Sequence, residues 1–249
     1  FFCYTQSMNW IAWLLVGLGI LSVLLLATGW WRYVLTGYLI ARVAPYEQPG
    51  GGAGSILFIG DSTGYGTGAS RSDESVAGRL GNAYTWYTIT NDSVNGRKIA
   101  GAMDVVAGLN ETDKYDLLVF QIGANDMLAG TSATETTERM QELVEAARPY
   151  VDNIIVLTCG NLGGPMIFQG KDGTRLTNTS RAYDDLMIEM VRQYQDVSFV
   201  PLFDEPETDP FLAEPRKHTA IDGLHPTSAG YSIWYTKAQP YFDAVLEQR

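Results

Sequence analysis

Four groups of polar residues, far apart in the sequence, have the residue types needed for acyl transfer. They are Gly60-Asp61-Ser62, Asn95-Gly96, Gly123-Ala124-Asn125-Asp126 and Asp222-Gly223-Leu224-His225. A serine hydroxyl is a weak nucleophile that needs an adjacent base. The chain has two histidines, His218 and His225, so the candidates for that base are few. We predict that Ser62 is the nucleophile and that His225 takes its proton.

Other residues of these groups can support the same reaction. Asp222 lies three residues before His225, where its carboxylate can accept the Nδ1–H of the imidazole and leave Nε2 free to act as the base. The tetrahedral intermediate of acyl transfer also needs hydrogen-bond donors at its oxyanion. We predict that the backbone N–H groups of Ser62 and Gly96 and the side-chain amide of Asn125 supply them.

Several polar residues also have a purely structural interpretation. A serine after a strand often caps the next helix, and Asn125 could simply form a turn. We expect Asp126 to be a structural residue or a helix cap. His218 has polar and charged neighbours in the sequence, and we expect it to be solvated. Cys159 follows an apolar run, and we expect it to be a small buried hydrophobe.

The polar groups follow, or closely precede, elements that the sequence predicts. Short apolar runs predict strands at 56–59, 86–90, 117–122, 154–158 and 199–203. Helix-like stretches occupy 74–80, 99–109, 133–147, 181–194 and 229–247. This alternation is typical of an α/β fold with a parallel sheet covered on both faces. Ligands bind at the carboxyl edge of such a sheet, so the four groups should converge there, with the glycine-rich segment 161–178 beside them in the cleft.

The N-terminal region has a different character. No charged residue occurs between Trp10 and Trp31, and this run of about 22 residues could cross a bilayer as a helix. Tryptophans at both of its ends suit the two membrane interfaces. We predict a single-pass transmembrane helix at 10–31, with the lipid bilayer as its partner. Arg32 and Arg42 follow it, which by the positive-inside rule favours a cytoplasmic position for the C-terminal domain.

These features predict four parts of the chain. Residues 1–9 form a tail in which Phe1–Ser7 look vector-derived and Met8 is a candidate native start. The membrane helix (10–31) is followed by a juxtamembrane helix and a glycine-rich linker (32–54), because the Pro-Gly-Gly-Gly run at 49–52 breaks any helix. The catalytic domain is expected at 55–249.

The composition excludes several classes of function. The 249 residues carry a formal net charge of −11 without a basic cluster, which argues against nucleic acid as a partner. The two cysteines, Cys3 and Cys159, lie far apart and indicate neither a zinc site nor a disulfide framework. The uncharged run has no G-x-x-x-G pattern that would favour tight helix pairing. A homo-oligomer stays open.

In order along the chain, Gly-Asp-Ser, a later Gly, Gly-x-Asn-Asp and Asp-x-x-His-Pro resemble the sequence blocks of the SGNH hydrolase superfamily of GDSL-like lipases and esterases. The resemblance extends from Ser55 to the C-terminus. It implies a flavodoxin-like three-layer sandwich with a five-stranded parallel sheet. It implies hydrolysis of acyl esters or thioesters, without a cofactor or a metal. It also implies that Ser62, His225 and Asp222 are catalytic and that Ser62, Gly96 and Asn125 form the oxyanion hole.

Two rival motifs overlap with the first group. Gly60-x-Ser62-x-Gly64 matches the nucleophile elbow of α/β-hydrolases, but in that fold several strands precede the elbow, whereas here one does. Gly64-x-Gly66-x-x-Ala69, with Asp92 downstream, matches a dinucleotide-binding fingerprint. That match would predict a nicotinamide-dependent oxidoreductase, and it leaves the groups around Asn125 and His225 unexplained.

A third alternative is a membrane-tethered binding module without catalytic activity. Loss of the serine or of the histidine would have indicated it, and both are present.

Overall fold

The computed structural model describes residues 5–52, 54–110, 112, 114–165, 167–168 and 170–247. The chain separates into two compact units, Phe1–Tyr38 and Leu39–Arg249. The tail predicted at residues 1–9 lies partly outside the described residues. Each unit is best considered by itself.

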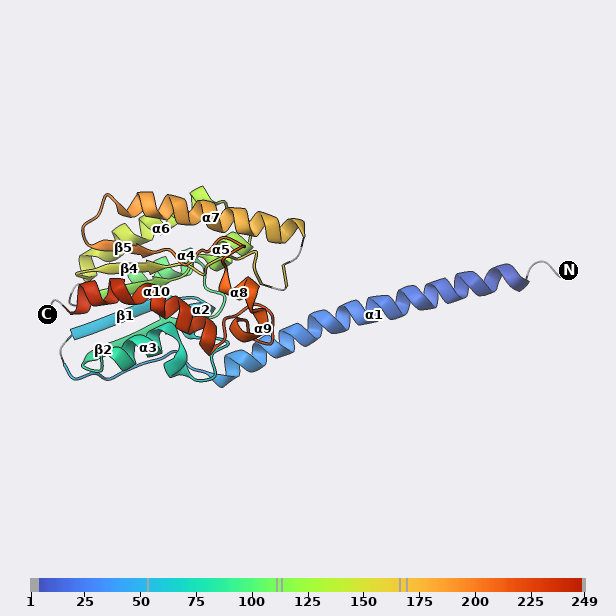
Figure 1. The fold of residues 1–249 in the computed structure, drawn as a ribbon, viewed down its shortest axis with the longest axis horizontal. Coiled ribbons are helices and arrows are strands. Elements are labelled where there is room, and N and C mark those ends of the chain that lie inside the picture. The colour runs from blue at the N-terminus through green and yellow to red at the C-terminus, as the bar shows by residue number, and fades with distance from the viewer. Residues whose placement is uncertain are drawn as a thin grey trace. The chain divides into compact units, whose positions relative to one another are not determined.

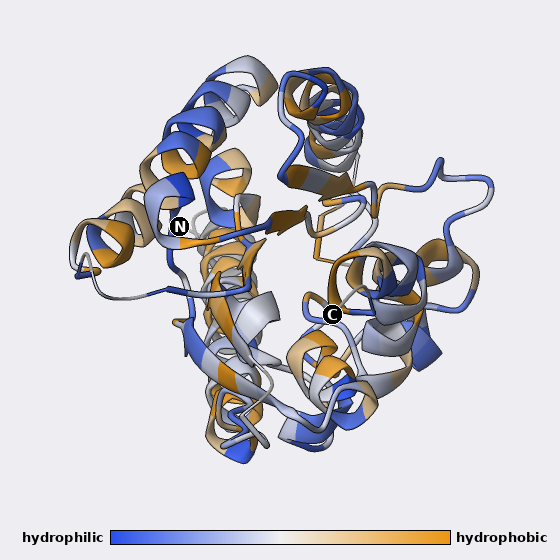
Figure 2. Ribbon diagram, turned by 90° about the vertical axis from the view of Figure 1, so that its left-hand side faces the viewer, coloured by the Kyte–Doolittle hydropathy of each residue, from blue (hydrophilic) through white to orange (hydrophobic). Residues whose placement is uncertain are grey.

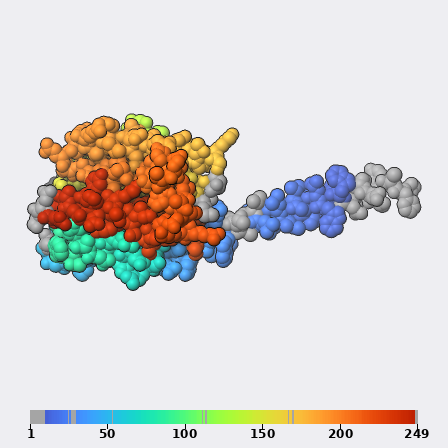
Figure 3. Space-filling view, in the orientation of Figure 1, coloured from blue at the N-terminus to red at the C-terminus, as the bar shows by residue number. Residues whose placement is uncertain are grey.

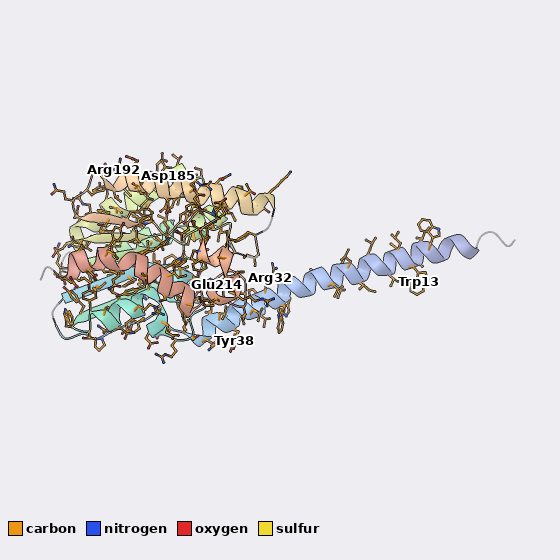
Figure 4. The ribbon with its side chains drawn as sticks, viewed as in Figure 1. Trp13, Arg32, Tyr38, Asp185, Arg192 and Glu214 are labelled. Carbon is orange, nitrogen blue, oxygen red and sulfur yellow. The ribbon has the colours of Figure 1, made fainter. Side chains whose placement is uncertain are left out.

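The described residues of the first unit belong to one long helix, α1 (Thr5–Arg42). Large apolar side chains along it are exposed, among them Trp13 at 74% and Leu26 at 73%, and Trp13 is labelled in Figure 4. In the part of the chain that the structure describes, no helix has the length and apolarity needed to cross a membrane. The transmembrane helix predicted at 10–31 is therefore not confirmed. The helix also continues through Arg32 without a break, so the predicted juxtamembrane helix is part of α1.

The second unit is built on a five-stranded parallel sheet with strand order β2-β1-β3-β4-β5 (Figure 1). Its strands are β1 (Gly54–Gly60), β2 (Tyr87–Ser93), β3 (Leu117–Gln121), β4 (Ile154–Leu157) and β5 (Val197–Val200). Each lies within two or three residues of its predicted position. The residues of β3 and β4 are buried throughout, as expected for a parallel sheet with both faces covered.

Helices cover both faces of this sheet. Side chains of α3 (Val76–Ala83) and α10 (Ser228–Leu246) pack on one face. Those of α4 (Ile99–Ala107), α6 (Ala133–Ala147) and α7 (Lys171–Val191) pack on the other. In Figure 2 several strands are coloured as hydrophobic and the helices around them alternate in hydropathy, and in Figure 3 α10 runs in red along the surface. The α/β prediction is confirmed.

Short elements complete the unit and lie mainly at the connections. They are α2 (Ser62–Tyr65), α5 (Ala124–Leu128), α8 (Pro210–Ala213), α9 (Pro215–His218) and the 3₁₀ turns η1 (Ser72–Glu74) and η2 (Arg148–Tyr150). The sequence analysis missed all of them, because each has too few residues to show a hydrophobic period.

The alternation of side chains in β1 explains how the two cores form. Leu57 and Ile59 point into the core under α4, α6 and α7, whereas Ile56 and Phe58 point into the core under α3 and α10. Burial of each such side chain contributes about 1.5–3 kcal/mol relative to exposure. A shift of one residue would exchange the two sets, so the register of β1, and with it the position of its carboxyl end, is strongly specified.

One helix extends into the segment that was predicted to form part of the cleft. The sequence analysis placed 161–178 in the cleft as a polar, glycine-rich segment, but α7 begins at Lys171. Leu176, Tyr183 and Met187 are buried in one core, and their spacing places them on one face of a helix. Polar residues between them had hidden this period.

The compact unit also begins earlier than the predicted boundary at Ser55. Leu39 and Val43 are buried, and Gln48 forms an antiparallel bridge with Ile89 through backbone hydrogen bonds of 3.0 and 2.8 Å. The Gln48 side-chain amide donates to Tyr87 O at 2.8 Å. The outer edge of β2 would otherwise present unpaired backbone groups, so residues 39–51 complete the sheet edge rather than only linking two regions.

Candidate active site

Ser62 lies just beyond the carboxyl end of β1, as the first residue of α2. Asp61 caps this helix, because its Oδ1 accepts hydrogen bonds from Thr63 N and Thr63 Oγ1, both at 2.8 Å. Gly66 ends the helix with φ of +89°, a conformation that costs glycine little. The first N–H groups of a helix have no carbonyl partner within it. Ser62 is half-buried, with its backbone N–H at the start of the turn.

His225 and Asp222 form a closed hydrogen-bonded loop before α10. His225 Nδ1 lies 2.6 Å from Asp222 Oδ2, and the other carboxylate oxygen accepts the backbone N–H groups of Leu224 (3.0 Å) and His225 (3.1 Å). The base of the loop is held by Ala220 N, which donates to His225 O at 2.7 Å. Both side chains of the pair are buried, so their hydrogen bond is shielded from bulk water.

Two opposing effects act on the pKa of Asp222. Burial alone would raise the pKa of this carboxyl group, but the hydrogen bond and charge of the His225 ring, with the two backbone N–H donors, outweigh burial and lower it. Asp222 therefore stays ionised and keeps its hold on Nδ1–H. That arrangement leaves His225 Nε2 as the ring nitrogen available for proton transfer.

The turn after α2 packs against the histidine loop, which brings the two halves of the site together. A side-chain carbon at Gly68 would lie 3.0 Å from His225 Cβ, so the backbone approaches this closely only with glycine there. Ser70 N donates to Ser228 Oγ at 2.9 Å. Among the described residues no hydrogen bond joins Ser62 to His225, and such bonds are commonly long before substrate binds.

Gly96 occupies a tight turn just after β2. Arg97 N donates to Val94 O at 3.1 Å and Gly96 has φ of +80°, which matches the third position of a type II turn, where glycine is favoured. The Arg97 N–H donates the hydrogen bond of the turn, so the Gly96 N–H takes no part in it. Val94 N donates to Gly60 O at 3.1 Å, which attaches the turn to the end of β1, next to Ser62.

Asn125 lies in α5, directly after β3, and points toward the same turn. Its Nδ2 donates one N–H to Arg97 O at 3.1 Å, which fixes the orientation of the amide and leaves the second N–H free to reach a ligand. Asn125 is half-buried. The structure thus places the predicted residues Ser62, Gly96 and Asn125 at one edge of the sheet, linked by hydrogen bonds.

Asp61 has a buried carboxyl group beside the site. Desolvation raises its pKa from 3.8 to about 6, against the lowering effect of its two hydrogen bonds with Thr63 and of the His225 charge. Its Oδ2 is buried without a hydrogen-bond partner among the described residues. Ionised Asp61 therefore destabilises the fold near neutral pH.

Asp126 has the structural role that the sequence analysis expected. It is fully buried, and its Oδ2 accepts the backbone N–H of Ile99 at 3.0 Å, at the start of α4. Arg139 Nη1 lies 3.3 Å from Asp126 Oδ1. Asp126 therefore satisfies a free N–H at the beginning of α4, and it does so from another segment of the chain.

The interpretation of His218 as a solvated residue is wrong. His218 is 5% exposed, because α9 packs against α10 and the ring lies 5.8 Å from that of Phe211. Its Nε2 lies 3.4 Å from Glu214 Oε2, a residue labelled in Figure 4. Its charged sequence neighbours had suggested exposure, but they lie on the outer side of α9. Cys159 is partly buried and packs against both hydrophobic cores, close to its expected role as a small buried hydrophobe.

Sequence analysis assigned no role to three residues that hold the site together: Thr67, Asn95 and Tyr231. Thr67 Oγ1 donates to Asn95 Oδ1 at 2.6 Å, and Tyr231 OH donates to Thr67 O at 2.8 Å. Asn95 directly precedes Gly96, which is the one local signal that could have indicated it. The contacts of Thr67 with Asn95 and Tyr231 connect distant parts of the sequence, so spacing alone cannot reveal them.

The dinucleotide-binding fingerprint does not have the geometry that it needs. Such glycines connect the end of a strand directly to the start of a long helix. Here Gly64 lies inside α2 and Gly66 ends it. This geometry does not support the oxidoreductase alternative.

Comparisons with known proteins concern the family and the fold of the chain. Residues 58–233 match the GDSL-like Lipase/Acylhydrolase family, and no curated protein matches the chain. The fold is similar to that of TesA, with a TM-score of 0.59 and 20% identity over 77% of this chain and 99% of TesA. It is also similar to a lipolytic G-D-S-L family protein from Veillonella parvula (TM-score 0.60, 18% identity, 76% and 97% covered). A third similar structure is Axe2, an acetylxylan esterase from Geobacillus stearothermophilus (TM-score 0.55, 20% identity, 79% and 95% covered).

Proposed function

Because the chain belongs to the GDSL-like lipase/acylhydrolase family and is a serine esterase, we propose that it cleaves acyl esters or thioesters through Ser62, His225 and Asp222. Ser62 Oγ attacks the acyl carbonyl carbon while His225 Nε2 takes the hydroxyl proton. Asp222 holds Nδ1–H and stabilises the imidazolium that forms. His225 then gives the proton to the leaving alcohol or thiol, and an acyl-enzyme remains on Ser62.

The second half of the reaction uses the same groups. A water molecule loses its proton to His225 and attacks the acyl-enzyme, and the acid leaves as Ser62 regains its proton. In both steps the oxyanion accepts hydrogen bonds from the backbone N–H groups of Ser62 and Gly96 and from the free N–H of Asn125. Each such donor contributes about 10²–10³ to the rate.

One observation carries this proposal. The buried Asp222–His225 pair, 2.6 Å apart, lies on a loop that packs against the turn following Ser62. A histidine with a purely structural role needs neither an ionised partner at Nδ1 nor a position beside a half-exposed serine. The second histidine, His218, has no such surroundings.

The test is ester hydrolysis by the wild type and by Ser62→Ala, with esters that range from acetyl to long acyl chains. We expect Ser62→Ala to abolish turnover while its thermal midpoint stays close to that of the wild type. Ser55→Ala is a matched control, because Ser55 lies at the opposite end of β1, where its hydroxyl donates to Lys114 O at 3.1 Å. Turnover by a folded Ser62→Ala protein would overturn the proposal, and the ester panel would define the acyl preference.

We further propose that the uncharged run 10–31, some of whose side chains lie outside the described residues, anchors the enzyme to a membrane as a single-pass helix. The support is the uncharged run from Trp10 to Trp31 and the exposure of its described apolar side chains. Arg32 and Arg42 favour a cytoplasmic position for the catalytic domain. Alkaline extraction of membranes tests the anchor: the full chain should stay in the pellet and a chain without residues 1–38 should not. Recovery of the full chain in the supernatant would contradict it.

A further inference from the structure

The turn that carries Gly96 has little packing to hold it in place. Gly96 is exposed, no described residue other than its chain neighbours lies within 4 Å of where its side chain would start, and Val94 is 49% exposed. Hydrogen bonds therefore determine where the turn sits. Val94 N binds Gly60 O on one side, and Asn125 Nδ2 binds Arg97 O on the other.

A third hydrogen bond reaches the middle of the turn from the segment that follows α2. Thr67 Oγ1 donates to Asn95 Oδ1 at 2.6 Å. Thr67 itself is fully buried. Its backbone N–H donates to Ser62 O at 3.0 Å, and its carbonyl accepts the hydroxyl of Tyr231 at 2.8 Å. One residue thus binds the nucleophile, the turn of Gly96 and the helix that follows the histidine loop.

From these contacts we propose that Thr67 is a positioning residue, whose hydroxyl holds the Gly96 turn where the N–H groups of Gly96 and Ser62 reach the same oxyanion. The inference rests on the proposed oxyanion role of Gly96. Thr67 touches no reacting atom; it acts through Asn95 on one side and through the backbone of Ser62 on the other.

The physical chemistry favours an effect on the transition state rather than on substrate affinity. Oxyanion donors act where charge develops during the reaction, and a misplacement of about 1 Å can cost about 10²-fold in rate. Loss of the Thr67 hydroxyl leaves the backbone contacts of Thr67 in place. Asn95 is half-buried, so water can replace the lost donor, and the turn should shift without unfolding the domain.

The test compares three variants with the wild type: Thr67→Val, which keeps the shape but lacks the donor, Thr67→Ser, which keeps the donor, and Thr137→Val as a control. Thr137 is also buried and its hydroxyl donates to Ala133 O at 2.9 Å inside α6. We expect Thr67→Val to lower kcat about 10- to 100-fold with little change in KM. Thr67→Ser should restore most of kcat, and Thr137→Val should lower the thermal midpoint without lowering kcat.

A double-mutant cycle shows whether the hydrogen bond between Thr67 and Asn95 transmits the effect on kcat. If Thr67→Val fails to fold, Asn95→Ala replaces it as the variant that lacks this hydrogen bond. Thr67→Val and Asn95→Ala should lower kcat by similar factors, and the double variant should lose no more than either one. Multiplied losses in the double variant, or a kcat for Thr67→Val equal to that of Thr137→Val, would overturn the inference while Ser62→Ala stays inactive. Activity in folded Ser62→Ala would instead overturn the proposed function itself.

Discussion

The two halves of the candidate site are built in different ways. The base half, Asp222 and His225, is contained in one loop of four residues, and its hydrogen bonds are local. The oxyanion half takes Ser62, Gly96 and Asn125 from the ends of three neighbouring strands, and hydrogen bonds between distant segments hold them together. Removal of His225 should therefore abolish the function of the base half, whereas removal of one donor from the oxyanion half should lower kcat only in part.

The largest expected effect separates the two histidines. His225→Ala should lower kcat by about 10⁴–10⁶-fold, the usual cost of losing the base of a serine hydrolase. His218→Ala is the matched control, because His218 is equally buried but has no ionised partner at Nδ1. It should lower the thermal midpoint and change kcat less than about threefold, since it creates a cavity and removes no reacting group. Equal losses in the two variants would show that the base half is wrongly assigned.

The pH profile of the wild type sharpens the same comparison. Only neutral His225 can accept the serine proton, so kcat/KM should rise with pH as the imidazolium loses its proton. The lowered pKa of Asp222 keeps its carboxylate charged, so the group that orients the imidazole ring is retained as the pH changes. A kcat/KM that falls as the pH rises from acid would contradict the assignment of His225 as the base.

A smaller effect is expected in the oxyanion half. Asn125→Ala should lower kcat by about 10²–10³-fold and change KM much less, because the lost N–H acts mainly on the transition state. Asn153→Ala is a suitable control, since its Nδ2 also donates to a backbone carbonyl, Asp116 O at 3.4 Å, next to the opposite ends of the strands. If the loss of Asn125 appears in KM alone, this amide binds the ground state.

The sequence predicted the base half more completely than the oxyanion half, for a physical reason. Asp222 and His225 are close in sequence, and their spacing already allows the hydrogen bond that the structure contains. Ser62, Gly96 and Asn125 could be predicted as a set from the alternation of strands and helices, because parallel strands end at one edge. The role of Thr67 could not be predicted, since its partners depend on how the turns pack in three dimensions. The contacts of Gln48 with the edge of β2 could not be predicted from the sequence for the same reason.

Asp61 should influence stability more than catalysis. Its pKa, raised from 3.8 to about 6 by burial, means that the folded protein holds this proton more tightly than the unfolded chain. The stabilisation is present below about pH 4 and is lost as pH rises through about 6, a cost of about 3 kcal/mol above that pH. Asp61→Asn keeps the Oδ1 acceptor and cannot ionise.

The measurement for Asp61 is thermal denaturation between pH 4 and pH 8. The decline of the midpoint with rising pH should be shallower in Asp61→Asn than in the wild type, and part of it should persist because burial also raises the pKa of Asp184 to about 7. Asp185→Asn, at an exposed position labelled in Figure 4, is the control and should follow the wild type. Identical profiles for all three proteins would show that Asp61 is not held in its protonated form.

The smallest expected effect on catalysis comes from the N-terminal unit. Every candidate site residue lies in Leu39–Arg249, so deletion of residues 1–38 should leave turnover of small water-soluble esters within about twofold, with the fold intact. Deletion of residues 1–52 should lower the thermal midpoint further, because it also removes buried Leu39 and Val43 and the pairing of Gln48 with β2. If both truncations melt at the same temperature, residues 39–52 contribute nothing to the domain.

The central claim, that Ser62 is the nucleophile, is tested most directly by covalent labelling. A fluorophosphonate should react with the folded wild type, and peptide mass spectrometry should locate a single adduct on Ser62. His225→Ala should label far more slowly, because the hydroxyl has lost its base, whereas His218→Ala should label at the wild-type rate. An adduct on any other residue, or no adduct on a preparation that hydrolyses esters, would contradict the account.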